Sequence, residues 1–107
     1  MLAKKNRLSR EEFNTYFKKG KRHHSPIATL VVSPHTEFHG SVVVSKKVSK
    51  KAPVRNTLRR RSYASLYTQL KQKNVTGVYI LILKPQFNTL SRKLQHAELQ
   101  KFIEQVV

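Results

Sequence analysis

The chain has 107 residues, a length that predicts a single domain able to bury about two-thirds of the surface that its unfolded form exposes. It carries 22 Lys and Arg against five acidic residues, and this formal charge of +17 exceeds what solubility requires and points to a nucleic acid as partner. There is no cysteine, which excludes disulfides, thiolate metal sites and cysteine nucleophiles and suits a reducing compartment.

Membrane and export signals are missing from the sequence. Met1–Arg7 contains no apolar stretch of signal-peptide length, and no segment approaches the roughly 20 apolar residues of a membrane span. We therefore expect a cytoplasmic protein that makes no contact with a membrane.

The first predicted element is a short helix over residues 10–18. Ser9 is a suitable N-cap and Glu12 occupies the third helical position, so the two residues can form a capping box. Leu8 and Phe13 have the spacing of a hydrophobic staple across the same helix start.

Phe13 and Phe17 lie four residues apart and therefore share one face of this helix, which Gly20 is expected to end. An aromatic pair at this spacing is more often part of a core than of a ligand site. A partly exposed ring can also stack on an unpaired base, a contact worth about 1–3 kcal/mol. Both interpretations stay open at this point.

Two segments rich in β-branched residues follow the first helix. Residues 27–32 are bounded by Pro26 and Pro34, and residues 41–45 contain three consecutive valines. Each segment predicts a strand. We expect a loop over residues 35–40 to join the two strands.

A long helix is predicted over residues 53–72, with Pro53 in its first turn. A spacing of four defines two adjacent rows of side chains, one of Val54, Leu58, Ser62, Leu66 and Leu70, the other of Arg55, Arg59, Tyr63 and Tyr67. Positive charge is therefore concentrated in the N-terminal half of this helix and apolar surface in its C-terminal half.

The last predicted elements are an apolar strand and a helix. Residues 78–83 are continuously apolar, which predicts a central strand covered on both faces. The helix over residues 90–106 has apolar positions on two faces, so its packing face stays open. The order α-β-β-α-β-α predicts an α+β protein, a small two-layer sandwich whose long helix connects two strands of one sheet, and it allows an extra short strand.

The most informative segment is the basic run of residues 46–61, which enters the long helix directly from the second strand. Eight of its sixteen residues are Lys or Arg and none is acidic. Each Arg in the first turns opposes the helix dipole by roughly a few tenths of a kcal/mol, a conflict that disfavours the alternative of a merely solvated surface helix. A polyanion would neutralise this charge, so the run predicts an RNA-binding surface. Its candidate contacts are the cations Lys46, Lys47, Lys50, Lys51, Arg55, Arg59 and Arg60, together with Asn56 for a base edge or a sugar.

The histidines do not predict a catalytic or metal site. His23 and His24 are adjacent, so their side chains point to opposite sides of an extended chain and do not converge on one substrate atom. Without cysteine, the spacing of the five histidines matches no compact zinc ligand set, and no glycine-rich phosphate loop is present. We predict no catalytic and no metal-ligating residue.

Two motifs of the chain form a recognisable pair. In one, a strand ends in Ser45-Lys46-Lys47, and after seven intervening residues a helix opens with Arg55-Asn56-Thr57-Leu58-Arg59-Arg60. In the other, residues 7–22 form an opening helix with two phenylalanines and a closing glycine. Together they resemble the bacterial ribonuclease P protein subunit family, and the resemblance covers most of the chain in order and length.

The resemblance implies a sandwich similar to the second domain of a small-subunit ribosomal protein, with a left-handed crossover through the long helix. It also implies an accessory subunit of an RNA enzyme that removes the 5′ leader of precursor tRNA. The partners would be the catalytic RNA and precursor tRNA, with no protein partner required. The chemistry would belong to the RNA and to Mg²⁺ bound mainly by that RNA.

The resemblance also assigns roles by position. The catalytic RNA would contact Arg55, Asn56, Arg59 and Arg60 on the long helix, with Lys46 and Lys47 adding backbone contacts. Phe13 and Phe17 would line a cleft between the opening helix, the sheet and the long helix, where the single-stranded leader lies.

Two positions depart from the family pattern. Thr57 stands where the family usually has Arg, which removes one cationic contact, and Arg61, four positions further on, is expected to point elsewhere. Residues 27–32 contain no aromatic residue, although the family often places one in the strand that faces the leader.

Two other functions are compatible with the same residues. A structural ribosomal RNA-binding protein would need a similar basic surface and fold, and it would not stimulate leader cleavage. A stand-alone ribonuclease would cleave precursor tRNA after all other RNA has been removed.

Overall fold

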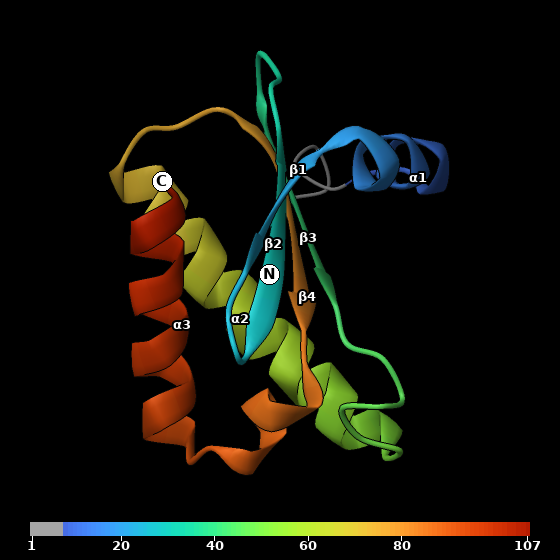
Figure 1. The fold of residues 1–107 in the computed structure, drawn as a ribbon, viewed down its shortest axis with the longest axis vertical. Coiled ribbons are helices and arrows are strands. Elements are labelled where there is room, and N and C mark those ends of the chain that lie inside the picture. The colour runs from blue at the N-terminus through green and yellow to red at the C-terminus, as the bar shows by residue number, and fades with distance from the viewer. Residues whose placement is uncertain (1–7) are drawn as a thin grey trace.

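The computed structural model describes residues 8–107, and Met1–Arg7, where no signal peptide was expected, lie outside the described residues. The elements in chain order are α1 (Arg10–Lys19), β1 (Lys21–His24), β2 (Ala28–Ser33), β3 (Phe38–Val43), α2 (Ala52–Gln72), β4 (Gly77–Leu83), the 3₁₀ helix η2 (Pro85–Thr89) and α3 (Arg92–Val106). The four strands form one sheet in the order β1-β2-β4-β3 (Figure 1). The predicted α+β class is confirmed, and β1 is the extra short strand.

The helices are divided between the two faces of the sheet (Figure 1). We call the face covered by α2 and α3 the inner face, and the face against which α1 packs the outer face. The sheet with α2 and α3 forms the two-layer sandwich, and α1 crosses one end of the outer face. No helix within residues 8–107 has both the length and the apolar character needed to cross a membrane.

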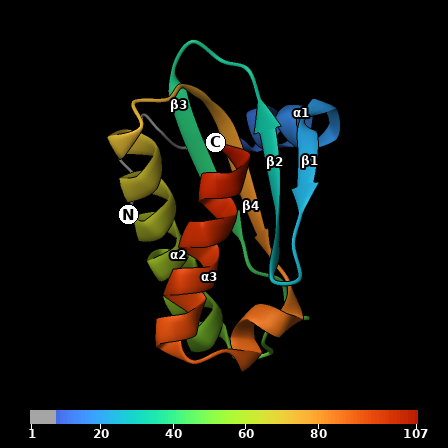
Figure 2. The same cartoon turned by 60° about the vertical axis from the view of Figure 1, so that its left-hand side comes forward.

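The long helix connects two parallel strands that are neighbours in the sheet. Strand β3 pairs with β4 in parallel, from Phe38 opposite Gly77 to Val43 opposite Ile82, whereas β2 pairs with β1 and β4 antiparallel. With the helices in front of the sheet, both β3 and β4 run downward and β4 lies to the right of β3 (Figure 2). The crossover is therefore left-handed, opposite to the usual preference.

Helix α1 begins as its sequence predicts. The backbone N–H of Glu12 donates to Ser9 Oγ at 3.2 Å, and the backbone N–H of Ser9 donates to Glu12 Oε1 at 3.0 Å, which completes the capping box. Leu8 and Phe13 both pack on the outer face of the sheet. The helix extends one residue beyond the predicted range of 10–18 and ends at the C-cap residue Gly20.

Strand β3 is displaced from its predicted position over residues 41–45. It comprises Phe38–Val43, so half of the predicted loop over residues 35–40 belongs to the sheet. Gly40 has little intrinsic strand preference, and pairing with β4 holds it extended. The prediction is displaced because it rests on the valines of residues 41–45, which indicate only a local preference for strand. The ends of β3 are set by its pairing with β4, a segment distant in the sequence. Strands β2 and β4 and the two longer helices match their predicted ranges to within two residues.

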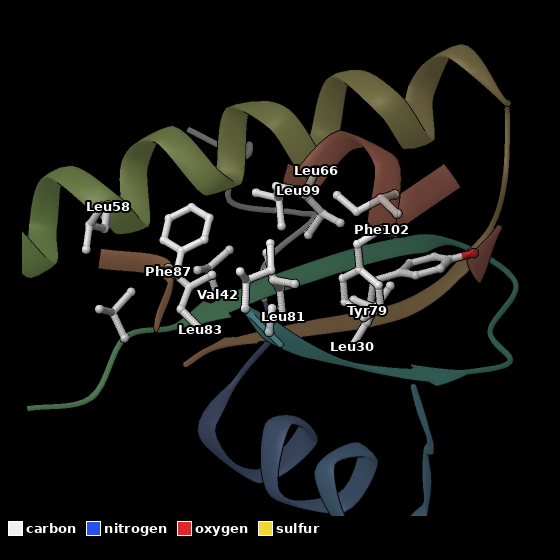
Figure 3. Close-up of a cluster of buried hydrophobic side chains, with 14 of the residues drawn as sticks. Leu30, Val42, Leu58, Leu66, Tyr79, Leu81, Leu83, Phe87, Leu99 and Phe102 are labelled. Carbon is white, nitrogen blue, oxygen red and sulfur yellow. The ribbon is translucent and has the colours of Figure 1, made fainter. Parts of the chain in front are cut away.

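The main core lies between the inner face and the two long helices (Figure 3). In the row of side chains predicted on α2, Val54 is half-buried against the main core. The other four members are buried, namely Leu58, Ser62, Leu66 and Leu70. The core members contributed by the strands and by the C-terminal segments include Leu30, Val42, Tyr79, Leu81, Leu83, Phe87, Leu99 and Phe102.

A smaller cluster covers the outer face. Val31, Val78 and Ile80 are buried there beneath side chains of α1. Strand β4 therefore carries apolar contacts on both faces, as its continuous apolar sequence predicts.

The C-terminal helix begins two residues later than predicted because Leu90, which ends the 3₁₀ helix η2, and the N-cap residue Ser91 both have extended backbone. Ser91 caps it by accepting the backbone N–H of Leu94 at 3.3 Å. Its buried face contains Gln95, Leu99, Phe102 and Ile103, which resolves the packing face that the sequence left open. The Gln95 amide donates to the carbonyl oxygens of Phe87 and Leu90 at 3.0 and 3.2 Å and so joins η2 to α3.

Candidate nucleic-acid interface

The start of α2 is an uncompensated positive pole. Lys51 is its N-cap residue and makes no side-chain capping hydrogen bond, and the first turn contains no acidic residue. Unpaired backbone N–H groups and the helix dipole already place partial positive charge at such an end. The lysines and arginines around it add to that charge, so this end favours an anionic partner.

The loop that carries the predicted lysines is held in place from beneath. Val48 is buried in the main core, and its carbonyl oxygen accepts a hydrogen bond from Asn88 Nδ2 at 3.1 Å. The Arg55 guanidinium donates to the carbonyl oxygen of Ser49 at 3.0 Å. On this support Lys46, Lys47, Lys50 and Lys51 are all exposed. Their positive charges therefore project from an anchored loop.

On the helix itself, Arg59 and Asn56 form a hydrogen-bonded pair. The Arg59 guanidinium donates to Asn56 Oδ1 at 3.0 Å, which leaves the amide N–H₂ of Asn56 as donor toward a ligand. Arg60 is exposed, and Arg55 and Arg59 are half-buried. Four of the predicted contacts thus occupy the first turns of α2, next to the lysine-bearing loop.

None of these cations is neutralised by a carboxylate. Within residues 8–107, the one ion pair joins His39 Nε2 and Glu37 Oε2 at 3.9 Å and involves neither Lys nor Arg. The arginines of α2 are thus neither buried against carboxylates nor dispersed, which is the arrangement that the RNA-binding interpretation requires.

Phe13 and Phe17 stack on each other with ring centroids 5.5 Å apart and planes inclined by 24°. Both are half-buried and pack on the cluster of Val31, Val78 and Ile80, so one side of the pair supports the fold. The Arg22 guanidinium lies 4.5 Å from the centroid of the Phe17 ring and donates to the Phe17 carbonyl oxygen at 3.0 Å. The pair is therefore part of the outer cluster and is also partly accessible beside a cation.

The phenylalanine pair and the basic helix start lie toward the same side of the sheet. In Figure 1 the first turns of α2 extend past the end of β3 toward the side that carries α1. Val43 and Ile82, both half-buried, form the outer face of β3 and β4 near that end. The predicted leader contacts and the predicted RNA contacts thus border one face of the protein.

Sequence reasoning did not predict a cluster of rings beside α1. His35 and His39 meet edge to face with centroids 4.6 Å apart, and Tyr16 packs edge to face on His35 at 6.0 Å. His35 Nδ1 accepts the backbone N–H of Glu37 at 2.9 Å. No local pattern could have revealed this contact, because it depends on where the loop before β3 returns to the sheet. Across the described part of the chain, no three His, Asp or Glu side chains form a group that could hold a metal ion.

The sequence-based placement of Arg61 is wrong. Thr57 and Arg61 are four residues apart and line the same cavity beside α2. Helical residues at this spacing share a face. Arg61 therefore places a cation one turn after Thr57, the position at which the family usually has Arg. The Thr57 hydroxyl itself donates to the Pro53 carbonyl oxygen at 3.0 Å and does not take over the role of a cation.

Fold and charge together define the class: a small α+β nucleic-acid-binding protein that presents an anchored basic loop and an uncapped basic helix start. A family model described as Ribonuclease P matches residues 2–107. The chain belongs to the ribonuclease P protein family, which assigns it to RNA binding and tRNA processing as a component of that endoribonuclease.

Individual relatives agree with this assignment. The ribonuclease P protein component of Nitratiruptor sp. is 28% identical over 98 residues, which cover 92% of this chain and 88% of the relative. That of Synechocystis sp. is 38% identical over 77 residues, which cover 68% of this chain and 62% of the relative.

Solved structures with a similar fold are RNase P proteins from Staphylococcus aureus. A mutant of that protein with defective mRNA degradation activity gives a TM-score of 0.79 at 17% identity, covering 96% of this chain and 89% of its own. A second structure of the S. aureus protein gives 0.70 at 18% identity, covering 94% and 91%. At these identities the likeness concerns the fold.

Proposed function

We propose that this chain is the ribonuclease P subunit that binds the catalytic RNA through the basic loop and the first turns of α2. The observation that carries the proposal is the uncompensated helix start, where Arg55, Arg59 and Arg60 face no carboxylate. Arginine suits RNA because its planar guanidinium can bind a phosphate in a bidentate manner. Lys46, Lys47, Lys50 and Lys51 supply further phosphate contacts.

The 5′ leader of precursor tRNA is assigned to the outer face beside α1. Phe13 and Phe17 offer partly exposed rings for stacking on unpaired bases, and the neighbouring Arg22 offers a cation for the leader backbone. The leader strand then passes between the phenylalanine pair and the start of α2. This route explains why one small domain needs both aromatic and basic surface.

The protein contributes binding energy, and the catalytic RNA cleaves the bond. Gripping a segment that only the precursor possesses raises affinity for precursor over mature tRNA. Its cations also reduce repulsion between the phosphates of leader and catalytic RNA, which lowers the concentration of Mg²⁺ that the RNA needs. We assign Mg²⁺ mainly to the catalytic RNA and give no protein side chain a part in the cleavage step.

Reconstitution tests this function. The catalytic RNA and precursor tRNA are incubated at a Mg²⁺ concentration at which the RNA alone is slow, with and without the 107-residue protein. We expect the protein to accelerate leader removal. We also expect it to increase the affinity for precursor tRNA more than the affinity for mature tRNA.

Two outcomes would contradict the proposal. Tight binding to ribosomal RNA without stimulation of cleavage would favour a structural ribosomal protein. Cleavage of precursor tRNA by protein freed of all RNA would favour a stand-alone ribonuclease.

A further inference from the structure

Two cavities meet between α2 and the start of α3, on the inner side of the sheet. The smaller has a volume of about 120 Å³ and the larger about 410 Å³. Their walls share Arg61, Arg92 and Gln95. The larger cavity extends along α2 to Pro53 in its first turn, so it begins at the proposed RNA surface and ends at the first turn of α3.

Positive charge at this junction is unpaired. Among the described residues, the guanidinium groups of Arg61 and Arg92 have neither a hydrogen-bond acceptor nor a carboxylate partner, and neither cavity wall contains Asp or Glu. The first turn of α3 also contains no acidic residue. Two like charges and a helix N-terminus that open on one junction favour an anion between them.

One buried polar group in the wall of the smaller cavity lacks a hydrogen-bond partner. Ser62 is 1% exposed and its hydroxyl has no hydrogen-bond partner, although an unsatisfied buried hydroxyl costs roughly 1–3 kcal/mol. Ser65 Oγ and His96 Nδ1 lie 3.3 Å apart on the same wall. A buried hydroxyl without a partner is what an incoming acceptor oxygen would satisfy.

From these observations we infer a phosphate-binding site at the junction of the two cavities, with Arg61 and Arg92 as its cations and a phosphate of the RNA backbone as its ligand. The inference rests on the proposed function and extends it. RNA would follow α2 from the basic loop to the start of α3, so the protein would bind RNA on both sides of the sheet.

Inorganic phosphate is the first probe, because it tests the chemistry without RNA. The double variant Arg61→Gln/Arg92→Gln is compared with Lys71→Gln/Lys101→Gln, which removes the same charge from exposed positions of α2 and α3. In NMR spectra of the wild-type protein, the side-chain N–H resonances of Arg61 and Arg92 should shift when phosphate is added. Phosphate should also shift the backbone amide resonances at the start of α3. These shifts should disappear in the arginine variant and persist in the lysine variant. Equal responses in the two variants would overturn the site.

Binding to the catalytic RNA is the second probe and identifies the source of the phosphate. Loss of one phosphate contact should reduce the slope of log K against log salt by about 0.7–0.9 beyond the change in the lysine control. Affinity should fall about tenfold or more, since hydrogen bonds to charged groups are lost. A variant that loses the response to inorganic phosphate and keeps the wild-type RNA slope would overturn RNA as the ligand.

A third variant separates failure of this inference from failure of the proposed function. Arg55→Gln/Arg59→Gln removes two proposed RNA contacts at the start of α2 and the hydrogen bond from Arg55 to the Ser49 carbonyl oxygen, and it leaves Arg61 and Arg92 in place. If that variant loses RNA affinity while Arg61→Gln/Arg92→Gln behaves like the lysine control, the inferred site is wrong and the proposed function stands. If neither variant changes RNA binding, the proposed function is wrong as well. Equal melting temperatures of the variants exclude unfolding as the cause.

Discussion

Gly20 lies where the end of α1 packs closely against strand β2. Its φ of −70° is open to any residue, so left-handed backbone does not explain the glycine. A Cβ at this position would overlap a Cγ of Val31 and lie 2.8 Å from the carbonyl oxygen of Tyr16. Glycine is required here because the end of α1 approaches β2 this closely.

Gly20→Ala should therefore destabilise the protein. Overpacking against a branched side chain and a backbone oxygen costs typically about 1–3 kcal/mol. Urea denaturation would measure the loss, with Lys18→Ala as an exposed control in the last turn of the same helix. Unchanged stability in Gly20→Ala would show that α1 can shift away from the sheet without cost.

Glu12 makes the start of α1 sensitive to acid. Hydrogen bonds from the backbone and side chain of Ser9 lower the pKa of the Glu12 carboxyl from its ordinary value. A folded pKa below the unfolded one means that the carboxylate stabilises the fold at any pH above the unfolded pKa. This stabilisation is lost as pH falls through the lower, folded pKa.

We expect the difference in melting temperature between the wild type and Glu12→Gln to shrink between about pH 6 and pH 3. The glutamine keeps an oxygen for the capping box and cannot ionise, so it isolates the charge. A difference independent of pH would mean that Glu12 contributes only its hydrogen bond.

At the level of elements, α2 performs two tasks along its length. Its row of Leu58, Leu66 and Leu70 packs on the inner face, while its first turns extend past the sheet with their cations unpaired. The helix therefore needs external charge at one end and supplies core contacts along the rest. Packing energy from the apolar row holds the repelling arginines in a helix that their own dipole interactions disfavour.

Arg55→Ala with Arg59→Ala should weaken RNA binding and flatten its salt dependence by about two units of slope, if each arginine contacts one phosphate. Affinity for the catalytic RNA, measured at several salt concentrations, gives the slope. Because Arg55 also donates to the Ser49 carbonyl oxygen, Arg55→Lys with Arg59→Lys is the matched variant that keeps charge and loses the guanidinium forks. If the lysine variant binds RNA more weakly but keeps the wild-type salt dependence, the charge of each residue contacts a phosphate and the guanidinium shape adds further affinity. An unchanged slope in the alanine variant would exclude both arginines as phosphate contacts.

Helix α1 likewise joins structure and recognition through one aromatic pair. Phe17→Leu keeps an apolar side chain on Val31 and Ile80 but removes the ring that stacks on Phe13 and lies beneath Arg22. We expect nearly wild-type stability and a preference for leader-bearing over mature tRNA reduced roughly fivefold or more.

Competition binding with the two tRNAs measures that preference, with Leu94→Ala, a residue 49% exposed on α3, as control. Loss of the cooperative unfolding transition in Phe17→Leu would assign Phe17 to the core alone. A stable variant with unchanged preference would remove the ring from the leader site.

For the whole molecule, the dominant fact is a formal charge of +17 on 107 residues. Net charge of this size destabilises a compact state through self-repulsion, and nearby carboxylates do not offset it among the described cations. The fold is therefore expected to be more stable with its polyanionic partner than alone.

The melting temperature of the free protein should rise as NaCl increases from about 10 mM to about 200 mM, because the screening length falls from about 30 Å to below 10 Å. Calorimetry at fixed pH measures the change. A melting temperature that is constant or falls over this range would indicate that repulsion between the cations does not limit stability.

The sequence by itself determined the α+β class, the capped start of α1, the apolar row of α2 and the position of the basic run. These features follow from local chemistry and from spacing along one element, which a sequence shows directly. Only the tertiary structure decided that β3 begins at Phe38, that His35 meets His39, and that Arg61 opens onto the same junction as Arg92. Each of these depends on which distant segments pack together, and that choice is made by the burial of the whole sheet between its helices.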